Sequence, residues 1–165
     1  MTGEGGGGDG ELRMQILVVC SGNICRSPYA EGYLRRQLAA QGKEATVISA
    51  GTLGIVGERA SSETLTLARS IGVDLDAHRS QGITYDRVDE ADTILVMEAA
   101  HRRTLTDLYP EIEEKIHLLS EFHPGVTDPP PAPDIFDPIG LPMEDYRRCF
   151  SLVRDSIDGF VAAQE

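Results

Sequence analysis

Short apolar segments recur along this chain, and they are separated by longer stretches with helical spacing of apolar residues. Each segment is rich in β-branched residues and only a few residues long, which is typical of strands buried on both faces. Strands that alternate with helices build a parallel sheet covered by helices. We therefore predict an α/β fold: a four-stranded parallel sheet flanked by helices on both faces. The strand segments are Gln15–Cys20, Thr46–Ile48, Thr93–Met97 and Lys115–Leu119.

Four helices are predicted between and after these strands. Ser27 is placed as an N-cap with Pro28 at the first helical position, and Gly72 is placed as a C-terminal stop. Pro-rich sequence from Pro124 to Pro138 should contain no regular element, because proline lacks an N–H donor. The predicted helices run from Pro28 through Leu38, from about Ser61 to Ile71, through His101, Leu105 and Leu108, and from about Met143 to Ala162.

Length and composition indicate one domain. The 165 residues fit a single compact unit, which we place at residues 15–165. Residues 1–14 contain six glycines and no apolar run, so we expect a flexible tail rather than a signal peptide. An odd number of cysteines without an export signal indicates reduced thiols and a cytoplasmic protein.

The charge balance restricts the partners. Asp and Glu total 27 against 15 Lys and Arg, giving a net charge of −12 with the basic residues scattered along the chain. This pattern argues against nucleic acid or an anionic membrane surface as a partner. A local anion site remains compatible with it, because a few backbone amides and one arginine suffice to build one.

The most informative stretch is Cys20-Ser21-Gly22-Asn23-Ile24-Cys25-Arg26-Ser27, between a buried strand and the start of a helix. Ligands bind at the carboxyl ends of parallel strands, and the amides of a helix N-terminus point at the same place. Gly22 and Asn23 tolerate the unusual backbone of a tight loop. The loop is therefore predicted to encircle an oxyanion.

Two side chains of this loop predict its chemistry. Arg26 can donate two parallel hydrogen bonds to phosphate oxygens. Cys20, at the foot of the positive field, should be a thiolate that acts as nucleophile and leaving group. The alternative is that Cys20 is only a small apolar residue at the end of a strand. The combination of Cys20 with Arg26, Gly22 and Ser27 favours the catalytic interpretation.

A thiolate phosphatase also needs an acid that protonates the leaving oxygen. Asp128 and Asp137, each followed by proline, are candidates, with Asp134 between them; Asp137 stands out because the final helix follows closely. No metal site is predicted, because Cys20 and Cys25 lack a second Cys/His pair at ligand spacing. No cofactor is expected, and His101 and His117 are assigned no role.

The stretch Val19 to Glu31 resembles the phosphate-loop signature of the low-molecular-weight protein tyrosine phosphatases. Further motifs occur in the family's order and extend the resemblance from about Gln15 to the last helix. These motifs are Ser49-Ala50-Gly51-Thr52, His78 before Ile83-Thr84, Ile94–Met97 before His101, and Asp137-Pro138.

The resemblance implies a role for each matching residue. Cys20 would be the nucleophile, Arg26 the phosphate clamp and Asp137 the general acid and then base. A hydrogen-bond network would hold Asn23 in a left-handed conformation, and Ser27 would also steady the Cys20 thiolate. The implied phosphate-loop residues are Ser21, Gly22, Asn23, Ile24, Cys25 and Ser27, and the network would include Ser49 and His78.

The substrate prediction rests on the walls of the expected pocket. Leu53, Ile55 and Ile139 occupy regions where family members specific for phosphotyrosine usually carry aromatic residues. Asp-Pro-Ile-Gly followed by Tyr146 is similar to the branch of bacterial phosphoarginine phosphatases. An aryl group gains from apolar walls, whereas a guanidinium does not. We therefore favour a phosphorylated protein with phosphotyrosine as the substrate, and phosphoarginine as the alternative.

Other functions are weighed against this one. A thioredoxin-coupled arsenate reductase resembles this family but needs two more cysteines, and no cysteine occurs between Cys25 and Cys149. A non-catalytic anion-binding module would not need the nucleophile and the acid. If Cys20 is oxidised to a sulfenic acid, Cys25 is close enough in the loop to capture it as a disulfide. Cys149 is expected to be a buried apolar residue.

Overall fold

The computed structural model describes residues 13–126 and 132–164. Most of the predicted N-terminal tail and the Asp128-Pro129 candidate lie outside these residues. The strands are β1 (Met14–Cys20), β2 (Ala45–Gly51), β3 (Thr93–Val96) and β4 (Ile116–Leu118). The helices are α2 (Arg26–Ala40), α3 (Ser62–Ser70), α4 (Tyr85–Glu90), α5 (Ala99–Leu108) and α6 (Met143–Ala163), with 3-10 helices at Pro110–Lys115 and Leu119–Phe122.

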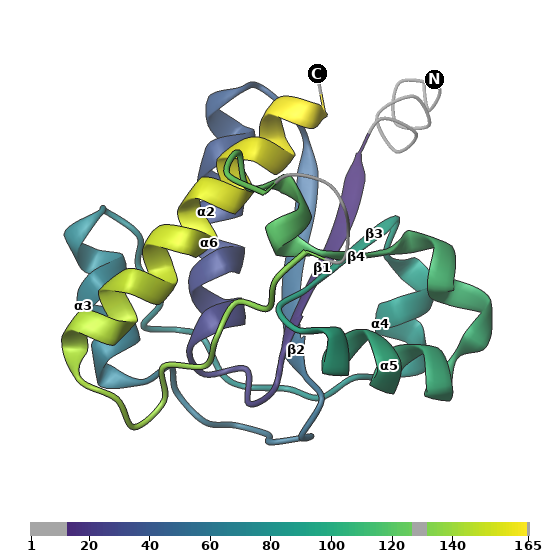
Figure 1. Ribbon diagram of the computed structural model, residues 1–165, viewed down its shortest axis with the longest axis horizontal. Coiled ribbons are helices and arrows are strands. Elements are labelled where there is room, and N and C mark those ends of the chain that lie inside the picture. Colours follow the sequence, from purple (N-terminus) through teal and green to yellow (C-terminus); the bar gives the residue numbers. More distant parts are fainter. Residues whose placement is uncertain (1–12, 127–131, 165) are drawn as a thin grey trace, which may run out of the picture.

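The four strands form one parallel sheet in the order β2-β1-β3-β4, which confirms the predicted fold class. Cys20 at the end of β1 pairs with Gly51 at the end of β2, and Val19 pairs with Val96 at the end of β3. The carboxyl ends of these three strands therefore meet at one edge of the sheet, at the bottom of Figure 1. This is the edge at which ligands bind in open α/β sheets.

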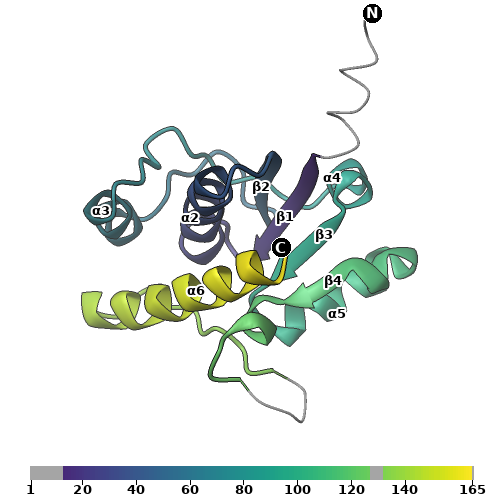
Figure 2. The ribbon, with the colours of Figure 1, turned by 90° about the horizontal axis from the view of Figure 1, so that it is seen from above.

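Helices cover both faces of the sheet (Figure 2): α2 and α6 pack on one face, α3 lies beside them, and α4 and α5 lie on the other face. Side chains along a strand alternate between faces, and β1 contributes to both cores. Ile16 and Val18 belong to the core beneath α2 and α6, whereas Leu17 and Val19 belong to the core beneath α4 and α5. Burial on both faces explains why β1 is apolar from Ile16 to Cys20.

Most element boundaries differ from the predictions by one to three residues. The strand predicted at Thr46–Ile48 extends to Gly51, and Lys115 belongs to a 3-10 helix rather than to β4. The prediction that Ser61 begins a helix is confirmed, because its side chain accepts a hydrogen bond from the Thr64 N–H (3.2 Å). The stop at Gly72 is also confirmed, with φ of 80°.

One local prediction is wrong, and one short helix was not predicted. Ser27 is not an N-cap: α2 already begins at Arg26, and Cys25 occupies the N-cap position without a side-chain cap. The Ser27 hydroxyl instead makes hydrogen bonds within the loop that precedes the helix. The helix that was not predicted is α4, which has six residues and is capped by Thr84; its single buried side chain, Val88, leaves no periodic apolar pattern.

Glycine at position 159 lets α6 approach the rest of the core. A Cβ atom there would lie 1.8 Å from the carbonyl oxygen of Phe122, so any side chain would push α6 away from the 3-10 helix at Leu119–Phe122. Phe122 and Phe160 then pack edge to face, with ring centroids 5.1 Å apart. Among the described residues, no helix combines the length and the apolar character needed to cross a membrane.

Candidate active site

The loop between β1 and α2 lies at the carboxyl edge of the sheet. Cys20 is the last residue of β1, and Arg26 is the first residue of α2. Asn23, between them, has φ of 61°, the one positive φ of a non-glycine residue among the described residues. Such a conformation is rarely adopted by a side chain with a Cβ atom, so it must be held by its surroundings.

Five hydrogen bonds involve Asn23, which is fully buried. Its Nδ2 donates to the Oγ atoms of Ser27 (2.8 Å) and Ser49 (2.9 Å), and its Oδ1 accepts from the Gln81 N–H (2.9 Å). The backbone oxygen of Asn23 lies 2.8 Å from His78 Nε2. The structure thus brings Ser27, Ser49 and His78 together around Asn23, and it adds Gln81, which the sequence analysis did not identify.

The fifth hydrogen bond reaches the candidate nucleophile. The backbone N–H of Asn23 donates to Cys20 Sγ (3.3 Å), and Ser27 Oγ lies 2.9 Å from the same sulfur. The left-handed conformation of Asn23 therefore directs its backbone N–H toward the thiol of Cys20.

The guanidinium of Arg26 is also buried, at 1% exposure, and it is held from two sides. Its Nη1 donates to the Glu98 carboxylate and to the backbone oxygen of Ile135, and its Nη2 lies 3.6 Å from Asp137 Oδ2. Burial lowers the pKa of Arg26, but negative charge at Cys20, Glu98 and Asp137 outweighs burial and raises it. Arg26 is therefore a fixed positive charge beside Cys20.

Asp137 approaches the loop from the segment before α6. Its Oδ1 accepts a hydrogen bond from the Ile139 N–H (3.1 Å), which leaves Oδ2 directed toward Arg26. Asp134 lies elsewhere: its Oδ1 accepts from the Ala99 N–H (2.8 Å) at the start of α5. Of the two described aspartates among the candidates, only Asp137 lines the pocket.

A pocket of about 160 Å³ lies over the loop and contains Cys20, Arg26 and Asp137. The side chains predicted as its walls line it: Leu53 and Ile55 from the loop after β2, and Ile139 after Asp137. The loop residues Ser21, Gly22, Ile24 and Cys25 complete the lining. The pocket is therefore polar at its foot and aliphatic at its mouth.

Gly51 shapes the pocket by allowing β2 to approach the loop. A Cβ atom at Gly51 would lie 2.5 Å from the backbone oxygen of Ser21 and 3.0 Å from the backbone nitrogen of Asn23. The Leu53 N–H in turn donates to the Ser21 oxygen (3.0 Å). Only glycine fits at position 51, so this contact explains sterically why the Ser-Ala-Gly-Thr motif contains a glycine.

The other two cysteines are buried thiols. Burial raises the pKa of Cys25, and its Sγ lies 3.6 Å from Ser61 Oγ and 3.7 Å from the Tyr146 hydroxyl. Cys149 is fully buried, as predicted, and burial raises its pKa to about 12. No group of three or more His, Cys, Asp or Glu side chains arranged for a metal occurs within residues 13–126 and 132–164.

Two residues at the start of α5 also contact the loop: Glu98, which was not singled out from the sequence, and His101, which was assigned no role. Glu98 forms the ion pair with Arg26, and His101 Nε2 lies 2.9 Å from Ser21 Oγ. The position of Glu98 in the sequence could have indicated this contact, because Glu98 stands two residues after the end of the buried strand β3. Polar residues at that point of a parallel sheet face the ligand edge.

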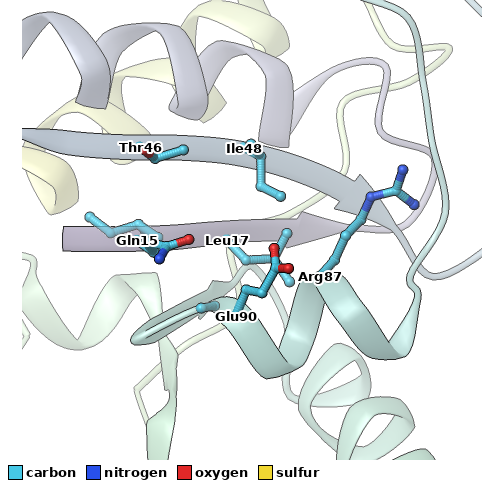
Figure 3. A pocket seen from close by; sticks show the side chains of 8 residues that line it. Gln15, Leu17, Thr46, Ile48, Arg87 and Glu90 are labelled. Carbon is cyan, nitrogen blue, oxygen red and sulfur yellow. The ribbon is translucent and has the colours of Figure 1, made fainter. Parts of the chain in front are cut away.

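A second hollow, of about 100 Å³, lies on the face of the sheet that carries α4 (Figure 3). Gln15 and Leu17 of β1, Thr46 and Ile48 of β2, and Arg87 and Glu90 of α4 surround it. It includes neither a cysteine nor any residue of the loop from Cys20 to Arg26. We assign it no catalytic role.

Comparisons with known proteins agree with this geometry. Residues 15–165 match the family model described as low molecular weight phosphotyrosine protein phosphatase. The chain is 32% identical over 146 residues to the probable low molecular weight protein-tyrosine-phosphatase EpsP of Ralstonia nicotianae, covering 88% of this chain and 92% of the relative. It is 34% identical over 144 residues to a protein-arginine-phosphatase of Geobacillus stearothermophilus, covering 87% and 91%.

A solved structure gives the same result for the fold. The low molecular weight protein tyrosine phosphatase from T. tengcongensis superposes with a TM-score of 0.82 at 35% identity, covering 91% of this chain and 99% of that chain. Its match extends over nearly the whole described structure. From the family match, the relatives and the shared fold together, we conclude that this chain belongs to the low molecular weight protein tyrosine phosphatase family.

Proposed function

We propose that this phosphatase hydrolyses phosphotyrosine in proteins through a phosphocysteine intermediate on Cys20. One observation carries the assignment: a thiol, a guanidinium and a carboxylate converge on the same pocket, from Cys20, Arg26 and Asp137. The loop leads from Cys20 directly into the N-terminus of α2, and the free backbone N–H groups of a helix N-terminus bind phosphate.

In the first step, the Cys20 thiolate attacks phosphorus and forms the S–P bond, while the bond from phosphorus to the ester oxygen breaks. Asp137, in its carboxylic acid form, gives its proton to the departing oxygen, so the alcohol leaves neutral. Arg26 donates hydrogen bonds to the equatorial oxygens, where charge accumulates in the transition state.

In the second step, the Asp137 carboxylate takes a proton from a water molecule as the water oxygen attacks phosphorus. The S–P bond breaks, inorganic phosphate leaves, and the Cys20 thiolate is restored with Asp137 again protonated. Hydrogen bonds from Ser27 and the Asn23 N–H to Cys20 Sγ stabilise the thiolate as a leaving group.

The choice of an aryl phosphate rests on the mouth of the pocket. Ile24, Leu53, Ile55 and Ile139 line it, and none of them offers a side-chain acceptor. A phenyl ring that buries apolar area gains about 25 cal/mol per Å² against such walls. A guanidinium buried there would lose hydrogen bonds to water, and these four aliphatic walls would replace none of them. The lining therefore favours phosphotyrosine over phosphoarginine.

Phosphoarginine is the second candidate, because the relative from Geobacillus stearothermophilus is named a protein-arginine-phosphatase. The same nucleophile and loop would serve both substrates. Tyr146, which also resembles the phosphoarginine branch, is 1% exposed and contacts Cys25 Sγ rather than the pocket. Its position therefore adds no support for a guanidinium substrate.

The test is a comparison of kcat/KM for matched peptides that carry phosphotyrosine, phosphoarginine or phosphoserine. We expect phosphotyrosine to be the best substrate, and Ile24→Thr to shift the preference toward phosphoarginine. Faster hydrolysis of phosphoarginine by the wild-type chain would overturn the substrate assignment and leave the Cys20 chemistry intact. Turnover of all three peptides by Cys20→Ser would overturn the chemistry as well.

We also propose that the protein works in the reducing cytoplasm. Its three cysteines, Cys20, Cys25 and Cys149, are free thiols in the structure. A thiolate nucleophile must remain reduced, and the cytoplasm keeps thiols in that state. Fractionation of cells that express the full chain tests this location. Recovery of most of the protein outside the cytoplasmic fraction would contradict it.

A further inference from the structure

His101 is a buried histidine that makes one hydrogen bond with each ring nitrogen. It lies in the first turn of α5 at 3% exposure. Nδ1 accepts a hydrogen bond from the Glu98 N–H (3.1 Å), and Nε2 lies 2.9 Å from Ser21 Oγ in the phosphate loop. Burial and the neighbouring charge of Arg26 lower the pKa of His101 to about 4. The imidazole is therefore neutral at neutral pH.

The backbone contact fixes which nitrogen carries the proton. A neutral imidazole has one N–H donor and one acceptor. Because Nδ1 accepts from the Glu98 N–H, the proton must be on Nε2, and Nε2–H donates to Ser21 Oγ. The direction of the hydrogen bond between His101 and Ser21 follows from the structure rather than from a choice of tautomer.

A second donor also faces the Ser21 hydroxyl. Arg26 Nη2 lies 3.4 Å from Ser21 Oγ. A hydroxyl oxygen has two lone pairs and one proton, so with both lone pairs facing N–H donors its own proton must point elsewhere. Ser21 lines the pocket above Cys20. The Ser21 hydroxyl proton can therefore point into the space where a phosphoryl group would bind.

We propose that His101 is a positioning residue that orients the Ser21 hydroxyl as a hydrogen-bond donor to the phosphoryl group. This proposal rests on the function proposed above and adds two residues to it. Ser21 would supply a donor besides Arg26 and the loop amides, and His101 would act only through Ser21. Neither the composition of the loop nor its spacing indicated this pairing, because the partners are 80 residues apart.

A purely structural role of His101 makes different predictions. If His101 only tied the start of α5 to Glu98, its replacement would lower stability and would impair the enzyme whether or not Ser21 carried a hydroxyl. If it acts through Ser21, its effect on catalysis must vanish once that hydroxyl is absent. A double-mutant cycle separates the two roles.

The experiment measures kcat and KM for para-nitrophenyl phosphate with wild type, Ser21→Ala, His101→Phe and the double variant. We expect kcat/KM to fall about tenfold in each single variant, as for the loss of one hydrogen bond to a charged group, with no further fall in the double variant. His101→Gln, which can donate and accept at similar positions, should restore most of the loss. Multiplying effects in the double variant would overturn the proposal.

Binding of inorganic phosphate provides a second measurement that needs neither turnover nor a stable His101 variant. In the Cys20→Ser background, calorimetry should show that Ser21→Ala weakens phosphate binding by about tenfold. Unchanged binding would overturn the proposal even if every His101 variant failed to fold. The two proposals can also fail separately. If Ser21→Ala weakens phosphate binding but the wild-type protein hydrolyses no aryl phosphate, the proposed function is refuted and the role of Ser21 is supported.

Discussion

Asp137 and Asp134 are three residues apart in sequence but make different contacts. Asp137 Oδ2 faces Arg26 in the pocket, whereas Asp134 Oδ1 is bonded to the Ala99 N–H at the start of α5. The sequence favoured Asp137 only through its closeness to the final helix and through the family resemblance, because both aspartates lie in a Pro-rich stretch without regular structure. Asp134, which binds the N-terminus of α5, is therefore no longer a candidate for proton transfer.

Asp137→Ala should therefore slow the enzyme in proportion to the basicity of the leaving group. For a phenol leaving group, kcat should fall about 10²-fold to 10⁴-fold, the usual contribution of a general acid. An activated phenol, which leaves without a proton, should lose far less. Rates for a series of substituted phenyl phosphates check this expectation.

Asp134→Asn is the matched control, because it removes a carboxylate near the site that does not line the pocket. It should lower thermal stability through α5 without steepening the dependence on leaving-group pKa. A steeper dependence in Asp134→Asn than in Asp137→Ala would show that the wrong aspartate has been assigned as the acid.

The buried imidazole of His101 also predicts a pH dependence of stability. Its pKa is lowered from 6.5 to about 4 in the folded chain, so the unfolded chain binds more protons between these values. Stability should therefore be lost as the pH falls from about 6.5 toward 4. The charged groups around the ring are Arg26, which lowers the pKa, and Glu98, Asp134 and Asp137, which raise it.

Urea unfolding of wild type and His101→Gln at several pH values checks this. The wild-type free energy of unfolding should decline more steeply than that of His101→Gln between pH 6.5 and 4. Ser21→Ala, which keeps the imidazole, should retain the steep decline. Identical slopes for wild type and His101→Gln would mean that the ring takes up its proton without penalty in the folded chain.

At the scale of the element, the strands and long helices could be predicted because their signals are local. β1 is apolar from Ile16 to Cys20, and Ser61 and Gly72 mark the two ends of α3. The short helix α4 could not be predicted, because its position depends on packing of Val88 against the core rather than on its own pattern.

The loop from Cys20 to Ser27 was predicted as an anion site from its own residues, whereas its support by Ser27, Ser49 and His78 was implied only by the family resemblance. Ser27 resembles an N-cap in sequence, yet its hydroxyl serves Cys20 and Asn23 instead. Gln81 and His101 bind the loop from 58 and 80 residues away. Such contacts depend on the tertiary fold, and a single sequence carries no local signal for them.

Two glycines allow a test of how the elements hold the site. Gly51→Ala would place a methyl group against the backbone of Ser21 and Asn23, so both stability and phosphate affinity should fall. Gly159→Ala would force α6 away from Phe122, on a different part of the fold, so stability should fall while the folded fraction keeps its phosphate affinity.

Thermal unfolding and phosphate calorimetry at a temperature below both transitions check these expectations. The two variants should differ clearly in phosphate affinity, since of the two glycines only Gly51 contacts the loop from Cys20 to Arg26. Equal phosphate affinity in folded Gly51→Ala and in wild type would show that the loop does not depend on its contact with β2.

At the scale of the whole molecule, the chain carries a net charge of −12, while the pocket contains a single arginine, Arg26. The buried guanidinium of Arg26 attracts phosphate only at short range, while the surface repels anionic proteins at long range. Salt screens the long-range repulsion, with a Debye length of about 10 Å at 0.1 M. The charge of the residues that flank the phosphotyrosine should therefore control the salt dependence.

Phosphotyrosine peptides with acidic or basic flanks should respond to salt in opposite directions. Between low salt and 0.2 M, kcat/KM should rise a few-fold for acidic flanks and fall for basic flanks. Para-nitrophenyl phosphate, which has no flanks, is the control for effects of salt on the chemistry itself. A fall in kcat/KM for both peptides would indicate that a local positive surface, rather than the net negative charge of the protein, controls substrate association.

The phosphocysteine on Cys20 is the central claim, and trapping it tests the account most directly. Rapid mixing with an aryl phosphate, acid quenching within the first turnover and peptide mass spectrometry should find one phosphoryl group on the peptide that contains Cys20. Asp137→Ala should accumulate more of it if hydrolysis of the intermediate is slowed more than its formation from an activated ester. A phosphoryl group on any residue other than Cys20, in a wild-type chain that is turning over, would contradict the account.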